Sequence, residues 1–382
     1  MRLLHTSDWH LGRSFHGVDL LTAQAGFLDH LVEVARSESV DVVVVSGDLY
    51  DRALPSADAV ALCDEGLSRL ASTGASLIVI SGNHDSATRL GWGSRLLSRS
   101  GVHVRCDVGL AGSPVVLADR HGEVAVYAVP YLEPHAVRDA LRAPEPGGHA
   151  AVLRAALARA RSDLSTRGGA RSVVLAHAFV VGGQGCASER DIGVGGVAAV
   201  PISLFDGFDY TALGHLHRQQ ALAPAVRYSG SPLAFSFSEA GHVKGSWLIE
   251  LSDQGRVQAH AVPAPVPRPL ALLRGTFDEL LTSPAHQHVE RHFLAITLTD
   301  AARPLDAMAR LRTRFPHAVC LEYAPEGRVH VADSYAVAVR SSSDADIAAA
   351  FVAHTRGSPA TFEEAELLAG GFAAARLAEV SG

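Results

Sequence analysis

Five short apolar runs, each ending in a cluster of polar residues, constrain the fold of this 382-residue chain more than any other feature. The polar clusters begin at Asp8, Asp48, Asn83, His177 and His215. Short apolar runs that stop at a polar residue are typical of buried strands. In α/β folds, functional groups gather just beyond the carboxyl ends of such strands. We therefore expect an α/β chain in which five loops bring these side chains to one edge of a sheet.

The clusters contain seven candidate metal ligands: Asp8, His10, Asp48, Asn83, His177, His215 and His217. Mixed histidine, carboxylate and amide donors favour Mn²⁺, Fe²⁺ or Zn²⁺ over Ca²⁺, which prefers oxygen ligands throughout. The set predicts a two-metal hydrolase, because two cations about 3.5–4 Å apart can clamp the attacking and leaving oxygens of a phosphoester. Asp48 is expected to bridge the ions, since a carboxylate can give one oxygen to each. The other six would divide between the ions, with Asp8 and His10 on one, Asn83 and His177 on the other, and His215 and His217 one to each.

Residues beside the ligands suggest the remaining chemistry. His84 follows Asn83, so it could protonate the leaving oxygen, with Asp85 holding its ring by a hydrogen bond. The expected nucleophile is a metal-activated water, since the sequence has neither a Gly-x-Ser-x-Gly elbow nor a P-loop. Asp51 would order the loop after Asp48, or only cap a helix. A local basic contribution near the site is expected from Arg13, Arg52 and Arg89.

Composition limits the class of protein. No apolar run approaches the ~20 residues of a membrane helix, and Asp8 comes too early for a signal peptide. The four cysteines are far apart, which is typical of free thiols in a reducing cytoplasm. The net charge of −7 argues against a protein that coats nucleic acid. It leaves room for an enzyme whose metals contact the phosphate, or whose partner carries the basic groove.

Periodicity and proline content suggest three parts. Helices are expected over 17–39 and 55–73, the second with Pro55 in its first turn, and over 134–170 around a break at 144–148. The proline-rich stretch 262–269 predicts a semi-rigid linker. We therefore expect a hydrolase domain over 1–265, a small α/β cap module over 266–340 and a helical tail over 341–382. The tail's second helix opens with a capping box at Thr361–Glu364, and Gly370-Gly371 should weaken it.

The clusters resemble the five motifs of the calcineurin-like metallophosphoesterases, at Asp8-x-His10, 47–51, 82–85, His177 and 214–217. Longer strings narrow the resemblance to the SbcD family of nuclease subunits. They are HTSDWHLG at 5–12, SGDLYDR at 46–52, SER at 188–190, ALGHLHRQ at 212–219 and YSGSP at 228–232. The similarity covers about residues 1–265 closely. Beyond that it is one of layout, and the alanine-rich tail departs from the family by offering poorer partner-binding helices.

The resemblance implies a two-sheet sandwich flanked by helices, followed by a DNA-recognition cap and a tail. It implies one metal held by Asp8, His10, Asp48 and His217, a second held by Asp48, Asn83, His177 and His215, and His84 as proton donor. It also implies a Mn²⁺-dependent double-strand exonuclease and single-strand endonuclease of DNA repair. Such a subunit would act in the cytoplasm as a homodimer with an SbcC-type coiled-coil ATPase, whose ATP hydrolysis controls access to the site.

Two alternatives remain open from the sequence. A phosphatase or cyclic-nucleotide phosphodiesterase of the same superfamily would use the same ligands, although the cap after a proline-rich linker and the tail favour the nuclease. A non-catalytic scaffold that recruits an ATPase is the second alternative. The complete ligand set together with His84 argues against it.

Overall fold

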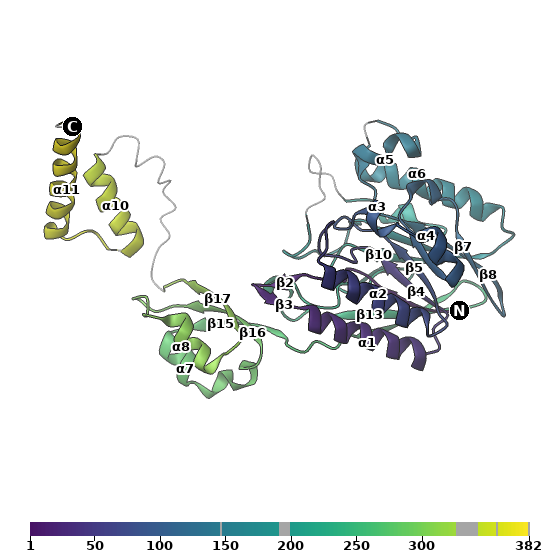
Figure 1. Ribbon diagram of the computed structural model, residues 1–382, viewed down its shortest axis with the longest axis horizontal. Coiled ribbons are helices and arrows are strands. Elements are labelled where there is room, and N and C mark those ends of the chain that lie inside the picture. Colours follow the sequence, from purple (N-terminus) through teal and green to yellow (C-terminus); the bar gives the residue numbers. More distant parts are fainter. Residues whose placement is uncertain (146, 191–198, 326–342, 357, 381–382) are drawn as a thin grey trace.

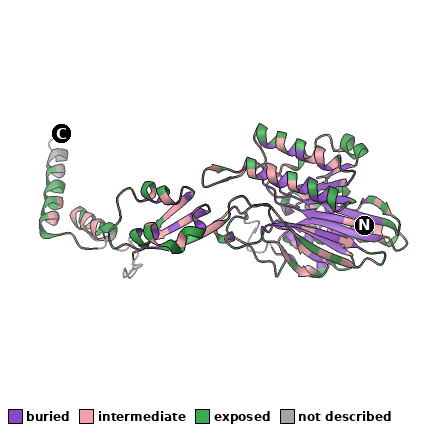
Figure 2. Cartoon of the chain, turned by 90° about the horizontal axis from the view of Figure 1, so that it is seen from below, coloured by how far each residue is buried: buried purple, intermediate pink, exposed green. Residues whose placement is uncertain are grey.

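The computed structural model describes residues 1–145, 147–190, 199–325, 343–356 and 358–380. Residues up to 263 form a four-layer sandwich in which two six-stranded sheets lie face to face with helices on both outer faces (Figure 1). This arrangement confirms the predicted α/β sandwich flanked by helices. Figure 2 shows the strands of the sandwich as its most buried part.

The first sheet has the order β14-β13-β1-β4-β5-β6. Its strands β1, β4, β5 and β6 are parallel, whereas β13 and β14 are antiparallel additions from later in the chain. The strand bounds are β1 Arg2–Thr6, β4 Val42–Ser46, β5 Ser76–Ile80, β6 Val102–Arg105, β13 Gly245–Leu251 and β14 Val257–Pro263.

The second sheet has the order β11-β12-β10-β9-β8-β7. Strands β8, β9, β10 and β12 are parallel, and antiparallel strands close both edges. The bounds are β7 Val115–Asp119, β8 Gly122–Val129, β9 Arg171–His177, β10 Tyr210–Gly214, β11 Gln220–Ala223 and β12 Val226–Tyr228. A buried cluster that includes Val44, Ile78, Val126, Leu175 and Ala212 fills the space between the two sheets.

Helices cover the outer faces of both sheets. Apolar residues of α1 (Leu21–Ser37) and α2 (Ala57–Ala71) pack on the first sheet, and those of α5 (Pro134–Leu141) and α6 (Gly148–Ser165) pack on the second. Short helices α3 (Ala87–Leu90) and α4 (Ser94–Leu97) follow β5. The break between α5 and α6 falls at the predicted proline and glycine residues.

Two helix starts differ from the sequence-based prediction. Residues 14–19 form a small hairpin, β2 (Ser14–Phe15) and β3 (Val18–Asp19), and α1 begins only at Leu21. The Asp19 side chain accepts a hydrogen bond from the Leu21 N–H at 2.8 Å, which favours a start at this point. Pro55 lies outside α2 rather than in its first turn, because Ser56 is the N-cap and accepts from the Ala59 N–H.

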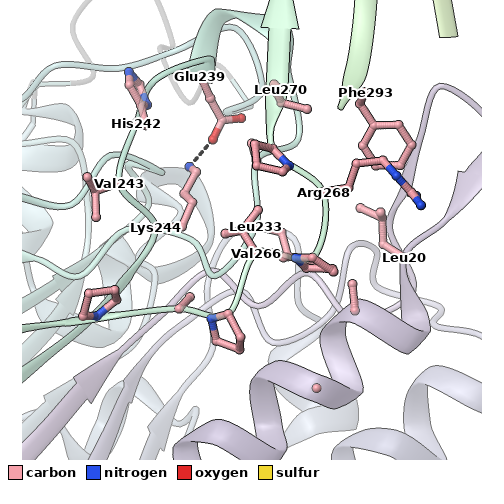
Figure 3. A pocket seen from close by; sticks show the side chains of 18 of the residues that line it. Leu20, Leu233, Glu239, His242, Val243, Lys244, Val266, Arg268, Leu270 and Phe293 are labelled. Atoms are coloured by element: carbon pink, nitrogen blue, oxygen red, sulfur yellow. Dashed lines mark hydrogen bonds and ion pairs between the residues drawn. The ribbon is translucent and has the colours of Figure 1, made fainter. Parts of the chain in front are cut away.

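The proline-rich linker is shorter than predicted, and a hydrogen bond holds its first residue. β14 continues to Pro263, and the Ala264 N–H donates to the Lys244 carbonyl at 2.8 Å. The stretch then lines a cavity of about 790 Å³ together with the start of α1, residues 241–244 and the first residues of the next module (Figure 3). The linker therefore forms one wall of a cavity between two parts of the chain.

The next module is a three-stranded parallel sheet with helices packed on it, as predicted for a small α/β unit. Its elements are β15 Leu270–Gly275, α7 Phe277–Thr282, β16 Phe293–Leu298, α8 Ala307–Arg314 and β17 Ala318–Tyr323. The Phe293 ring lies 5.2 Å from the Phe15 ring of the β2–β3 hairpin. The predicted boundary at residues 340 and 341 lies outside the described residues.

Two helices, α10 (Asp344–Arg356) and α11 (Phe362–Val380), form the described part of the tail. The capping box is present, because the Glu364 N–H donates to the Thr361 hydroxyl while the Thr361 N–H donates to the Glu364 carboxylate. Helix α11 continues through Gly370 and Gly371, so the glycines do not interrupt it. Among the described residues, no helix has both the length and the apolar character needed to cross a membrane.

Candidate metal centre

The seven candidate ligands meet where the carboxyl ends of parallel strands from both sheets come together. Asp8 follows β1, Asp48 follows β4 and Asn83 follows β5 of the first sheet, whereas His177 ends β9 and His215 follows β10 of the second. The sequence predicted one sheet edge, and the site in fact lies between two. Hydrogen bonds from backbone N–H groups join the loops, since the Asp8 N–H donates to the Gly47 carbonyl and the His215 N–H donates to the Asp8 carboxylate.

The backbone at four of these positions is in the left-handed region that L-residues rarely adopt. The φ angles are 53° at Asp8, 45° at His10, 51° at Asp48 and 108° at His215. Such conformations cost of order 1–3 kcal/mol each and persist where the surrounding structure holds them, often at functional sites. The strain falls on the candidate ligands themselves.

One group of donor atoms gathers around His10. Its Nε2 lies 3.1 Å from the Nε2 of His217 and 3.7 Å from Oδ2 of Asp48. Donor atoms of Asp8, His10 and His217 all lie within 4.8 Å of one another. These side chains are buried, so a cation bound between them would be shielded from bulk water.

A second group gathers around the Asn83 side-chain oxygen. This atom lies 2.8 Å from Nε2 of His177 and 3.1 Å from Nδ1 of His215. The His177 Nε2 is also 3.5 Å from Oδ2 of Asp48. Asp48 therefore reaches both groups, as a bridging ligand must. The pairing of His217 with His10 and of His215 with Asn83 matches the division that the family resemblance implies.

Burial disfavours charge throughout this cluster. Burial and the neighbouring Asp48 charge raise the pKa of Asp8, and burial raises the pKa of Asp48. Burial lowers the pKa values of His10, His215 and His217, and lowers that of His177 to about 4. The imidazoles are therefore neutral and keep a lone pair for a metal, and a bound cation would favour the ionised form of the two carboxylates.

The donor atoms themselves support the same interpretation. Asn83 contributes its Oδ1 and His10 its Nε2 to the two groups. The other side-chain atoms of these residues, Nδ2 of Asn83 and Nδ1 of His10, are not the atoms that would hold a cation, and they have no hydrogen-bond partner among the described residues. Neutral imidazoles, an amide oxygen and a shared carboxylate fit two divalent cations of the Mn²⁺, Fe²⁺ or Zn²⁺ type.

His84 lies beside the ligands, but Asp85 does not hold its ring. The His84 Nδ1 bonds to the Asp51 backbone carbonyl at 2.7 Å, and the His84 N–H donates to Asp48 at 2.8 Å. The Asp85 carboxylate instead accepts from the backbone N–H groups of residues 49, 50 and 82. The predicted Asp85–His84 bond is thus wrong, because Asp85 is used to join the two ligand loops. Burial and the Asp48 charge raise the pKa of Asp85 to about 6.

A hollow of about 450 Å³ opens beside His84. It is lined by His84, Ser14, Asp51 and three arginines, namely Arg13, Arg52 and Arg190. Three arginines were expected near the site. Arg13 and Arg52 line this hollow, whereas the exposed Arg89 on α3 does not. Arg190 was assigned no role from the sequence. It follows Ser188 and Glu189, which contact His217, and this contact could not be foreseen because 29 and 28 positions separate them from it.

Comparison with known families agrees with this geometry. Residues 1–219 match the calcineurin-like phosphoesterase model. This match spans more than half of the chain, which therefore belongs to the calcineurin-like phosphoesterase family and is a metal-dependent hydrolase. Residues 266–356 match a second model, SbcD_C, described as the type 5 capsule protein repressor C-terminal domain. The two matches together confirm the resemblance to SbcD, the nuclease subunit of the bacterial SbcCD complex.

Several solved structures share a distant likeness. TT1561 of Thermus thermophilus is 14% identical with a TM-score of 0.39, covering 68% of this chain and 98% of its own. A dimetal phosphatase from Danio rerio is 16% identical with a TM-score of 0.39, covering 69% and 99%. GAP50, the anchor in the inner membrane complex of Plasmodium, is 12% identical with a TM-score of 0.37, covering 85% and 98%.

Proposed function

We propose that this hydrolase is a Mn²⁺-dependent DNA nuclease, with double-strand exonuclease and single-strand endonuclease activity in DNA repair and end processing. The observation that carries the proposal is the hollow lined by His84 and three arginines, where His84 adjoins the ligand groups through its N–H bond to Asp48. A phosphodiester in this hollow would meet positive charge and a proton donor at the same time. The SbcD_C match favours DNA as the substrate class over a small phosphate ester.

The ligand residues have defined tasks in this proposal. Asp8, His10 and His217 would hold one ion, Asn83, His177 and His215 the other, and Asp48 would join both. When bound, the ions would activate a water and stabilise the charge of the phosphate. The chain's own loops keep these donors fixed, because Asp8 is held by the His215 N–H and Asp48 by the His84 N–H.

His84 is placed to donate a proton from its Nε2. A carbonyl oxygen can only accept, so the 2.7 Å bond to Asp51 requires a proton on Nδ1 of His84. This bond fixes the ring, and Nε2 is then the nitrogen that can act on a substrate. The protonated ring could then give its Nε2 proton to the leaving oxygen of the phosphodiester.

The arginines reconcile this substrate with an acidic chain. Guanidinium groups bind phosphate oxygens with two parallel N–H bonds, so a few of them suffice for local recognition despite a net charge of −7. Arg13 is held in place by Asp51 at 3.5 Å and by the Ser188 carbonyl at 3.0 Å. Arg52 has 72% of its side chain exposed, and its guanidinium lies 3.7 Å from the Asp51 carboxylate.

Partners are part of the same proposal. We propose that residues 341–382 dock on an SbcC-type coiled-coil ATPase and that the cap module, 266–340, contacts DNA. A homodimer is also proposed. The exposed apolar side chains on the segment of α3 and α4, with Trp92 83% and Leu96 68% exposed, are candidates for its interface.

The test compares two substrates with the purified chain and Mn²⁺, with and without the coiled-coil ATPase. Degradation of linear duplex DNA supports the nuclease. Cleavage of a chromogenic phosphodiester without activity on any DNA, even with the ATPase, would instead favour the phosphodiesterase alternative. Arg190→Ala should weaken DNA binding at all sequences. It should also reduce the salt dependence of the binding constant by the amount that corresponds to about one phosphate contact. Arg89→Ala, an exposed arginine outside the hollow, is the matched control.

A further inference from the structure

His217 is held at three points by side chains from two distant segments. Its N–H donates to Glu189 at 2.8 Å, and its carbonyl accepts from the Lys244 ammonium at 2.9 Å. Its ring Nδ1 lies 2.7 Å from the Ser188 hydroxyl. Of these four residues, Ser188, His217 and Lys244 are buried. The remaining ring nitrogen, Nε2, faces His10 in the metal centre.

The direction of the hydrogen bonds can be derived from Glu239. Figure 3 shows the ion pair between Glu239 and Lys244 beside the proline-rich segment. Oε1 of Glu239 also accepts from the backbone N–H groups of Phe235 and Ser236, each at 2.9 Å. An ammonium and two amides can only donate, so Glu239 is an ionised carboxylate whose oxygens accept. The Ser188 hydroxyl, 2.6 Å from the same Oε1, must therefore donate to it.

A hydroxyl has a single proton, and this fixes the state of the His217 ring. Because Ser188 gives its proton to Glu239, its oxygen can only accept from Nδ1 of His217. The proton of the neutral imidazole is then on Nδ1, and the lone pair is on Nε2. We propose that Lys244, Glu239 and Ser188 are positioning residues that select this tautomer of His217 and so direct its Nε2 lone pair at the metal.

The other histidines show why this residue needs such a chain of contacts. Nδ1 of His177 bonds to the Ser46 carbonyl at 2.9 Å, and a carbonyl sets the tautomer alone because it can only accept. A serine hydroxyl can donate or accept, so it sets a tautomer only if a carboxylate behind it claims its proton. His215 differs again, since its Nδ1 rather than its Nε2 faces the Asn83 oxygen. The Gly-His-x-His motif therefore does not define which nitrogen binds.

The first test observes the tautomer directly in the metal-free, full-length protein. Long-range ¹⁵N–¹H NMR spectra of histidine-labelled protein distinguish Nδ1–H from Nε2–H rings, and the His217→Gln spectrum identifies the signal of His217. We expect an Nδ1–H ring for His217 at neutral pH. An Nε2–H ring would overturn the inference. This readout needs no metal and no variant of the three positioning residues, so it holds even where Ser188→Ala fails to fold.

The second test measures Mn²⁺ binding. The inference rests on the metal centre proposed above, and Ser188→Ala and Glu239→Gln should each weaken one of its two ions by about 10–100-fold while leaving the other unchanged. Ser172→Ala is the matched control. Ser172 is also buried, donates to a carboxylate (Asp209, 3.0 Å) and accepts from an N–H, but at the opposite end of β9. It should bind both ions as the wild type does.

The outcomes separate the two proposals. Wild-type affinity for both ions in Ser188→Ala and Glu239→Gln would reject the positioning role. If the wild type itself bound no second ion, the metal centre would be wrong, while the NMR spectrum would still decide the tautomer of His217. Equal weakening in Ser172→Ala would show a general loss of stability and would also reject the inference.

Discussion

His10 and His217 face each other through Nε2 atoms that lie 3.1 Å apart, although 207 positions separate them in the chain. The two residues follow strands of different sheets, so their approach depends on the packing of one sheet on the other. The metal centre consequently forms only when the whole sandwich has folded. The same relationship makes the division of ligands between two ions testable.

Single-ligand variants should lose different ions. His217→Ala should deplete the ion held with Asp8 and His10, and His215→Ala the ion held with Asn83. Asp48→Asn should be the most damaging single change, because this carboxylate reaches both groups. Anomalous scattering from Mn²⁺-soaked crystals of each variant measures the occupancy of each position. Loss of the same ion in both histidine variants would contradict the division.

His84→Ala should reduce cleavage by about 10²–10⁴-fold while both metals stay bound. The reason is that its ring is hydrogen-bonded to the Asp51 carbonyl and lines the hollow, beside the ligand groups. Single-turnover cleavage rates and metal content of the purified variant are the two measurements. Stoichiometric loss of one ion would make His84 a ligand and reject its role as a proton donor.

Removal of residues 341–382 should leave a folded, metal-loaded enzyme that no longer associates with its ATPase. The tail exposes large apolar side chains on α11, with Phe362 79% and Leu367 77% exposed. Apolar residues of this size on a helix are typical of a docking element. An unchanged melting temperature with lost co-purification is expected. A large fall in melting temperature with association retained would show that the tail packs on its own cap module.

Acid should destabilise the sandwich through His5, a residue outside the ligand set. His5 is fully buried between the Tyr210 hydroxyl, at 2.8 Å, and the Leu213 carbonyl, at 3.1 Å. Burial lowers its pKa to about 3, against about 6.5 in the unfolded chain. Below pH 6.5 the unfolded state therefore binds a proton that the folded state does not, and the free energy of unfolding falls as the pH falls.

The contribution of His5 to the free energy of unfolding should decline by about 1.4 kcal/mol for each unit by which the pH falls between 6.5 and 3. Urea unfolding of the wild type and of His5→Gln at several pH values measures it. The difference in unfolding free energy between the two proteins should shrink with acid. A difference that stays constant over this window would contradict a neutral, buried His5.

The ligands could be found from sequence because each cluster begins at the end of a strand or a few residues beyond it. A strand that ends in a buried sheet delivers the next residue to a defined edge, so Asp8, Asp48 and Asn83 could be placed by local pattern alone. The sequence could not show that two sheets share the site. The packing of one sheet on the other depends on side chains such as Ile78 and Leu175, which come together in one buried cluster only in the folded protein.

The misassigned partner of Asp85 has a physical cause. Asp85 was assigned to its neighbour His84, but its carboxylate accepts from backbone amides of another loop. Arg190, which was assigned no role, lines the hollow, while the place of Arg89 near DNA stays a prediction. Adjacent residues in a loop need not interact with each other once the loop turns. Contacts between loops of different strands therefore had no local signal.

The left-handed backbone at Asp8, His10, Asp48 and His215 sets stability against chemistry at the same four residues. Glycine adopts that conformation without strain, so a glycine there would relax the chain while deleting a ligand. A population of this protein selected in the laboratory only for heat resistance would thus be free to lose its ligands one by one and keep its sandwich. Only selection for hydrolysis would hold the four side chains in place, and an inactive descendant could be the hardier one.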